Sequence, residues 1–166
     1  MKSYLKKIDI ATIGNRYDVT PLFADSECLS QLVEDLTFPF RKSQLDFVAC
    51  IDALGFILGT AVACRLNIGI IPLRKGGKLP VQTESVEFRD YSGEIKRLEI
   101  RKDILSPQDR VLLVDEWIET GAQIKAAAEL IEGQGAILEA IAVINMDSNE
   151  QTKEIARKYR VHVVGI

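Results

Sequence analysis

The sequence predicts an α/β fold, a doubly wound and mainly parallel sheet with helices on both faces. Short apolar runs recur along the chain, and segments with helical spacing separate them. The runs are apolar throughout rather than alternating, which is typical of strands that are buried on both faces. The 166 residues fit one domain, and no repeat or linker-like change of composition divides them. We therefore expect a single domain over residues 1–166.

The first half of the chain predicts two helix–strand pairs. Apolar residues at helical spacing predict a helix over residues 26–36. The run 46–51 predicts a central strand, residues 55–66 predict a second helix, and the run 68–73 predicts a second strand. The segment 83–100 departs from this plan because it is polar and highly charged. We expect it to form an antiparallel hairpin that projects from the sheet.

The second half continues the alternation of strands and helices. The run 111–114 predicts a buried strand with charged residues on both sides. The following helix is indicated by apolar residues that share one face, and we expect Gly133 or Gly135 to end it. Two more strands are predicted over 140–145 and 161–164, on either side of a polar helix over 150–158. Ligands of such sheets bind beyond the carboxyl ends of the strands.

Composition excludes several classes of function. The net charge of −3 and the pI near 5.3 argue against a broad basic face for duplex nucleic acid. No apolar run is long enough to span a membrane, and residues 1–10 contain no signal-peptide core, so we expect a cytoplasmic protein. The three cysteines do not have the spacing of a zinc site, and we expect no metal ligands in the chain.

The single histidine, His162, lies in an apolar run near the C-terminus and is expected to be a structural strand residue. A Ser-His-Asp triad or a histidine-rich metal site would have to depend on it alone. The chemistry is therefore expected to use carboxylates, backbone amides and basic side chains.

The strongest functional signal is the segment 110–123, RVLLVDEWIETGAQ. An apolar strand is followed by the acids Asp115 and Glu116, and a Thr120-Gly121 turn then opens a helix. Backbone amides at such a turn, together with the helix dipole, can bind a phosphate. The acid pair can accept hydrogen bonds from vicinal hydroxyls. A sugar phosphate satisfies both halves of the segment, whereas the simpler alternative is that the acids only cap a helix.

This segment resembles the phosphoribosyl pyrophosphate (PRPP) motif of type I phosphoribosyltransferases, most closely that of the adenine enzymes. The likeness covers roughly residues 15–145, in the same order along the chain. Besides the PRPP motif, it includes an N-terminal signature at 18–22, a pyrophosphate loop and helix at 51–59, and a basic strand and loop at 71–80. A flexible hood over the active site would span about 81–100, and residues 98–100 match the point where it rejoins the core.

The resemblance implies a PRPP-dependent purine phosphoribosyltransferase, a pentosyltransferase of purine salvage with a type I phosphoribosyltransferase fold. Such an enzyme joins a base to PRPP and releases pyrophosphate, giving a nucleoside 5′-monophosphate. The resemblance also implies Mg²⁺, bound mainly through PRPP, and a homodimer.

The resemblance also implies a role for each matching residue. Asp115 and Glu116 would hold the ribose hydroxyls. Glu119 to Gln123 would surround the 5′-phosphate, which includes Thr120, Gly121 and Ala122. The pyrophosphate would meet the amides of Ala53 and Leu54 and the cations Arg74, Lys75 and Lys78, with Arg74 able to reach across a dimer interface. The alternative for the three cations is an ordinary solvated loop.

Glu119 is the first candidate for acid–base catalysis, and Asp90 in the hood is the second. A carboxylate beside a phosphate is unfavourable unless it points toward the base, and the hypoxanthine-guanine branch has an acid at the matching position. Tyr91 corresponds to a hood tyrosine that shields the site, and Tyr17 stands where an arginine is usual. For Asp90 and Tyr91 the alternative is an ordinary polar hairpin.

Departures from the family pattern favour a second hypothesis. Leu54 replaces a usual arginine, Glu116 a usual aspartate, and Gln123 a usual threonine. The second hypothesis is therefore a non-catalytic regulator or sensor that binds PRPP or a nucleotide on the same fold. A response-regulator-like domain also fits the strand and helix pattern, but it explains neither the acid-Thr-Gly segment nor the basic loop.

Overall fold

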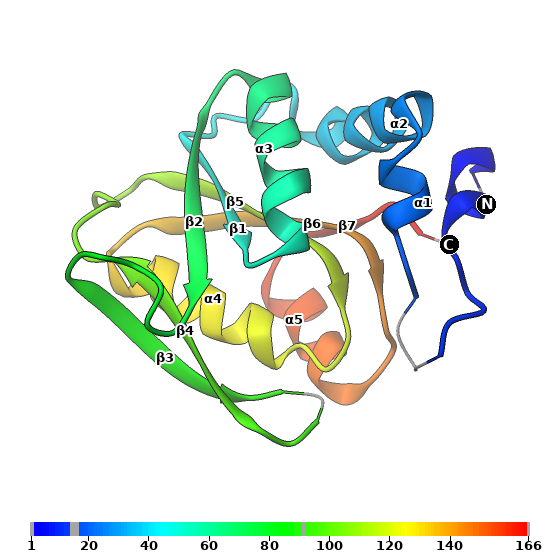
Figure 1. Ribbon diagram of the computed structural model, residues 1–166. Coiled ribbons are helices and arrows are strands. Elements are labelled where there is room, and N and C mark those ends of the chain that lie inside the picture. The colour runs from blue at the N-terminus through cyan, green and yellow to red at the C-terminus, as the bar shows by residue number, and fades with distance from the viewer. Residues whose placement is uncertain (1, 14–16, 91, 166) are drawn as a thin grey trace.

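The computed structural model describes residues 2–13, 17–90 and 92–165. Within these residues the strands form one seven-stranded sheet in the order β3-β4-β2-β1-β5-β6-β7 (Figure 1). Five strands, β2, β1, β5, β6 and β7, run parallel to one another. β4 pairs antiparallel with β2, and β3 pairs antiparallel with β4 at the edge of the sheet. The strands are β1 Phe47–Ile51, β2 Gly69–Lys75, β3 Thr83–Arg89, β4 Ile95–Arg101, β5 Arg110–Ile118, β6 Ile137–Met146 and β7 Val161–Val163.

Helices cover both faces of the sheet, as the sequence predicts. A 3-10 helix (Ser3–Lys7), α1 (Thr20–Phe23), α2 (Ser26–Thr37) and α3 (Leu54–Leu66) cover one face, while α4 (Ala122–Gly133) and α5 (Glu150–Lys158) cover the other (Figure 1). Neighbouring residues of the central strands belong to opposite cores. Val48 and Leu112 pack on the α3 side, whereas Ala49 and Leu113 pack on the α4 side. Burial on both faces explains why these strands are apolar throughout.

The predicted hairpin prolongs the sheet rather than only projecting from it. β4 pairs with the end of β2 at Arg74 and Lys75, and β3 packs against α4 (Figure 1). Leu98 and Ile100 on β4 are fully buried in the core. The base of the hairpin is therefore fixed to the core, while its tip extends beyond it.

An ion pair between the buried Glu99 and the exposed Arg97 secures the join between the hairpin and the basic loop after β2. Glu99 is 4% exposed and contacts Arg97 at 3.0 Å, and its second oxygen accepts a hydrogen bond from the Gly77 amide at 2.9 Å. Arg97 lies across Gly76, where a Cβ would come within 2.6 Å of its Nε. The turn at Gly76 and Gly77 thus has a packing role as well as a conformational one.

The largest difference from the sequence prediction is the length of β5. The strand was expected to end at Val114, but it continues to Ile118 because β6 runs beside it as far as Met146. Asp115 is therefore part of the strand and pairs in register with Val143. The short 3-10 and α1 helices near the N-terminus were not predicted, since segments of four or five residues carry too little periodicity.

His162 has the structural role that the sequence predicts. It lies in β7, half-buried, with Nε2 3.0 Å from the Asp35 carbonyl oxygen and its ring edge-on to Phe40. Burial lowers the pKa of His162 below its ordinary value. No helix in the described part of the chain is long and apolar enough to cross a membrane.

Candidate active site

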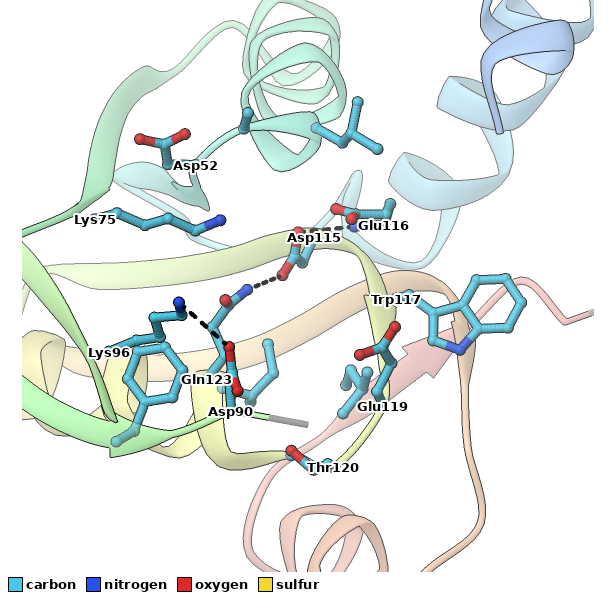
Figure 2. Close-up of a pocket in the computed structure, with 16 residues that line it drawn as sticks. Asp52, Lys75, Asp90, Lys96, Asp115, Glu116, Trp117, Glu119, Thr120 and Gln123 are labelled. Atoms are coloured by element: carbon cyan, nitrogen blue, oxygen red, sulfur yellow. Dashed lines mark hydrogen bonds and ion pairs between the residues drawn. The ribbon is translucent and has the colours of Figure 1, made fainter. Parts of the chain in front are cut away.

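A cavity of about 260 Å³ lies at the carboxyl ends of β1, β2 and β5, with the hairpin on one side (Figure 2). Most of the sequence-predicted site residues line it. They are Ala53, Leu54, Lys75, Asp90, Asp115, Glu116, Glu119, Thr120, Gly121 and Gln123. Arg74, Lys78, Ala122 and Tyr17 lie outside this lining, and Tyr91 falls outside the described residues. The lining also includes residues that the sequence analysis did not assign, namely Asp52, Phe88, Lys96, Trp117, Ile118 and Ile124.

The two acids of the pair differ in their surroundings. Asp115 is only 2% exposed, and its Oδ1 accepts a hydrogen bond from the Glu116 amide at 3.0 Å. Its Oδ2 accepts one from the side-chain amide of Gln123 at 3.1 Å. Burial, together with the neighbouring charge of Glu116, raises the pKa of Asp115 well above its ordinary value. Glu116 is half-buried and is the more accessible acid of the two.

The start of α3 packs closely on Asp115. A Cβ on Gly55 would lie 2.8 Å from Asp115 Oδ1 and 3.3 Å from the Val114 carbonyl oxygen. Only glycine therefore permits this approach of the helix to the acid. A longer residue would displace either the carboxylate or the loop at Ala53 that precedes the helix.

The segment Glu119 to Gln123, called the phosphate loop below, leads from β5 into α4. Gly121 has φ +85° and is the N-cap of α4, where it supplies no side chain to the helix. Thr120 Oγ1 accepts a weak hydrogen bond from the Ala122 amide at 3.3 Å. The remaining amides of the first turn and the helix dipole favour an anion here. Gln123 was expected to donate to a phosphate, but in this structure its amide donates to Asp115.

The basic residues are arranged around one aspartate. Asp52 Oδ2 lies 3.2 Å from Lys78 Nζ and 3.5 Å from Arg74 Nε, and its side chain is 8% exposed. Burial alone would raise the pKa of Asp52, but Lys78, Arg74 and Lys75 outweigh it and lower the pKa. Lys75 is not among the ion-paired cations of Asp52, and Figure 2 shows it reaching into the cavity. The sequence predicts that these cations lie together, but it carries no signal for the carboxylate that two of them share.

Asp90 lies in the turn of the hairpin, on the cavity wall. Its Oδ1 accepts hydrogen bonds from the Ser92 hydroxyl at 2.6 Å, the Ser92 amide at 2.8 Å and the Glu94 amide at 3.2 Å. Lys96 Nζ lies 3.9 Å from its other oxygen (Figure 2). The hydrogen bonds from Ser92, followed by the other contacts, lower the pKa of Asp90. Asp90 is therefore an ionised group that also stabilises the turn.

An aromatic pair borders the other end of the cavity. Trp117 donates from Nε1 to Asp147 Oδ1 at 2.8 Å, and the ring of Tyr17 meets it edge-on with 5.2 Å between centroids. Figure 2 shows Glu119 between Trp117 and the rest of the cavity. Trp117 stands directly after the acid pair in the sequence, and this position was the only available signal for its place in the cavity.

Comparisons with known proteins agree with the resemblance. A family model described as phosphoribosyl transferase domain matches residues 26–164. An adenine phosphoribosyltransferase from Cupriavidus pinatubonensis is 42% identical over 130 residues, which are 78% of this chain and 68% of that protein. One from Nitrosococcus oceani is 41% identical over 146 residues, 87% of this chain and 84% of that protein.

Solved structures give the same result. The crystal structure of adenine phosphoribosyltransferase from Rhodothermus marinus has a TM-score of 0.88 at 30% identity and covers 98% of this chain and 96% of its own. The Giardia lamblia enzyme complexed with 9-deazaadenine has a TM-score of 0.89 at 28% identity and covers 98% of this chain and 94% of its own.

The buried charge of Asp115 should lower the stability of the fold as pH rises. A carboxyl whose pKa is raised by folding binds its proton more tightly in the folded state, so the free energy of unfolding falls as pH increases above the ordinary value of 3.8. Asp115→Asn removes this charge and should raise the free energy of unfolding at pH 8. At pH 4.5, where the folded protein keeps this proton, the substitution should change the free energy of unfolding less.

Urea unfolding at pH 4.5 and pH 8 measures the effect, with the exposed Asp103→Asn as the control. The difference between Asp115→Asn and the unmodified protein should be larger at pH 8. A variant that is destabilised equally at both pH values would contradict the expected cost of this charge.

Proposed function

The chain belongs to the phosphoribosyltransferase family, and we propose that it transfers the 5-phosphoribosyl group of PRPP to a purine base, adenine before others. It is thus a glycosyltransferase of the pentosyl type, acting in purine salvage. The observation that carries this proposal is the convergence, on one cavity, of an acid pair, the phosphate loop and Lys75 of the basic segment. Each of these suits a different part of PRPP.

We assign the parts of PRPP to the cavity as follows. The 5′-phosphate meets the phosphate loop through Thr120 and the amides that begin α4. Glu116, the accessible acid, accepts hydrogen bonds from the ribose hydroxyls, while Asp115 supports it from the buried side. The pyrophosphate lies between the Ala53–Leu54 backbone and Lys75, with Arg74 and Lys78 close by on Asp52.

The reaction breaks the bond between C1 of the ribose and the pyrophosphate, and the transition state develops positive charge at C1. Catalysis then depends on stabilising the leaving pyrophosphate and on excluding water. Lys75 and the amides before α3 stabilise the leaving pyrophosphate. The hairpin, acting as a hood over about 81–100, excludes water. Glu119, which lines the cavity beside Trp117, is placed to exchange a proton with the base.

We propose that Mg²⁺ enters the cavity with PRPP. Mg²⁺ keeps much of its water and is usually held by substrate phosphates rather than by a protein cage. The acidic and amide oxygens of the cavity suit such a hydrated ion, and no residue of this chain is assigned as its dedicated ligand. When bound, the ion neutralises charge on the pyrophosphate as it leaves.

A regulator without turnover is the second candidate, and Leu54 favours it. Leu54 is 37% exposed at the cavity, in a loop that usually has an arginine to meet the leaving group. Asp52 also neutralises part of the charge of Arg74 and Lys78. Both features weaken the attraction for pyrophosphate, while they leave the sugar-phosphate end of the cavity unchanged.

We also propose that the chain works in the cytoplasm as a homodimer. All three cysteines are unpaired, which suits a reducing compartment. The contacting elements α3 and β2 expose Leu54, Ile57 and Ile70, which are 37%, 47% and 39% exposed. Arg74 lies on the same strand as Ile70, and the resemblance to the family suggests that it reaches across such an interface.

Pyrophosphate release in the presence of PRPP and Mg²⁺ tests the activity directly. Adenine should be the best substrate among adenine, hypoxanthine, guanine, xanthine, orotate and uracil. The Leu54 departure leads us to expect a slower leaving-group step than in an enzyme with arginine there. If no base supports turnover while PRPP or a nucleotide still binds, the chain is the regulator of the second candidate function.

Glu119→Gln should abolish most of the turnover while PRPP binding is retained. The variant keeps the shape of the side chain but removes its acid–base capacity, and loss of such a group costs about 10²- to 10⁴-fold in rate. Asp90→Asn is the comparison, since Asp90 is the second candidate. Normal turnover of Glu119→Gln, with a slow Asp90→Asn, would transfer the acid–base role to Asp90.

Ile57→Glu should convert the proposed dimer into a monomer. A carboxylate on this exposed apolar position of α3 would have to be buried without a partner in the dimer, which is strongly unfavourable. Light scattering after size-exclusion chromatography should give half the mass of the unmodified protein. Ile104→Glu, at an exposed loop position elsewhere, should leave the mass unchanged. A monomeric unmodified protein would contradict the proposal.

A further inference from the structure

The segment between β6 and α5 holds the end of β5 through three hydrogen bonds. The Asp147 amide donates to the Ile118 carbonyl at 2.8 Å, which extends the backbone hydrogen bonding between β5 and β6 by one bond. Asp147 Oδ1 accepts from Trp117 Nε1 at 2.8 Å. Asn149 Nδ2 donates to the Glu119 carbonyl oxygen, also at 2.8 Å. The last of these bonds acts directly on the backbone of the phosphate loop.

The side chain of Asn149 has two separate tasks. Its Oδ1 accepts from the Thr152 amide at 3.0 Å and caps α5, while Thr152 Oγ1 accepts from the Asn149 amide in return. Its Nδ2 is not needed for this cap and points to Glu119 instead. A serine or aspartate at the same position could cap the helix equally well. Aspartate has no donor for the Glu119 carbonyl, and the shorter serine has only the one oxygen that the cap would use.

α5 contacts the phosphate loop at a second point. Ile155, which is 1% exposed, lies so close to Gly121 that a Cβ there would come within 2.7 Å of its Cδ1. The two contacts fall on Glu119 and Gly121, on either side of Thr120. The backbone that presents Thr120 and the first amides of α4 is therefore held from α5.

We propose that Asn149 is a positioning residue for the phosphate loop, and that its hydrogen bond to the Glu119 carbonyl sets the affinity for the 5′-phosphate of PRPP. The proposal rests on the proposed function, because it takes the phosphate loop to bind that group. Asn149 does not line the cavity, so it acts through the loop rather than on the ligand.

Two variants separate the bond from the cap. Asn149→Ser retains a good N-cap but lacks the separate amide group that reaches the Glu119 carbonyl. Asn149→Asp retains the shape and places a carboxylate oxygen against that carbonyl. The KM for PRPP should rise by about two- to tenfold in Asn149→Ser, the range expected for one hydrogen bond, and further in Asn149→Asp. The KM for adenine and the thermal midpoint should remain close to those of the unmodified protein.

Asp25→Ser is a matched control, because Asp25 is the N-cap of α2 and accepts from the Glu27 and Cys28 amides away from the cavity. It exchanges one capping side chain for another and should leave both KM values unchanged. An unchanged KM for PRPP in both Asn149 variants would overturn the proposal. A parallel rise in both KM values together with a lowered thermal midpoint would also overturn it, since that pattern indicates general loosening of α5.

Binding of ribose 5-phosphate keeps this test independent of turnover. Trp117 is the only tryptophan of the chain and lines the cavity, so its fluorescence can follow binding. If the unmodified protein has no turnover but its dissociation constant for ribose 5-phosphate rises in the Asn149 variants, only the proposed activity fails. If the constant does not change in the variants, the positioning role fails. If ribose 5-phosphate does not bind at all, both fail.

Discussion

The carboxylate of Asp115 lies where β5, α3 and α4 meet, and its burial constrains all three. One oxygen is approached by the first turn of α3 at Gly55, and the other accepts the Gln123 amide from α4. Burying a charge is unfavourable unless hydrogen bonds satisfy it, so Gln123 and the Glu116 amide must stay in place. The loop before α3 and the phosphate loop are thereby held at a fixed separation. This separation sets the width of the cavity that lies between them.

Charge is balanced locally rather than over the whole molecule. A chain of net charge −3 still gathers Arg74, Lys75 and Lys78 at one edge of its cavity, and Asp52 pairs with two of them. Asp52 thus holds the side chains of Arg74 and Lys78 close to each other. In the proposed function, a polyphosphate would share these two cations with Asp52, and this competition would lower its affinity. Lys75 stands outside those ion pairs and lines the cavity.

Much of the fold could be predicted because buried parallel strands leave a direct trace in the sequence. The runs ending at Ile51, Leu73 and Val114 all lie in strands, and the predicted Thr-Gly turn does follow β5 and lead into a helix. What could not be predicted depends on neighbours distant in the chain. β5 extends past the acids only because β6 runs beside it, and the Asp52 ion pairs need the basic loop to fold back. The contact of Asn149 with Glu119 joins residues 30 positions apart and has no local signature.

The departures from the family pattern are connected through these distant contacts. Where the family usually has a threonine hydroxyl in the phosphate loop, this chain has Gln123, which is long enough to reach Asp115 and donates there instead. The loop therefore loses one side-chain donor for a phosphate. In the proposed function, phosphate binding would then depend more on backbone amides, whose directions are set by the loop conformation rather than by a rotatable side chain. A loop that binds through its backbone needs firm support, and Asn149 and Ile155 of the neighbouring segment supply it.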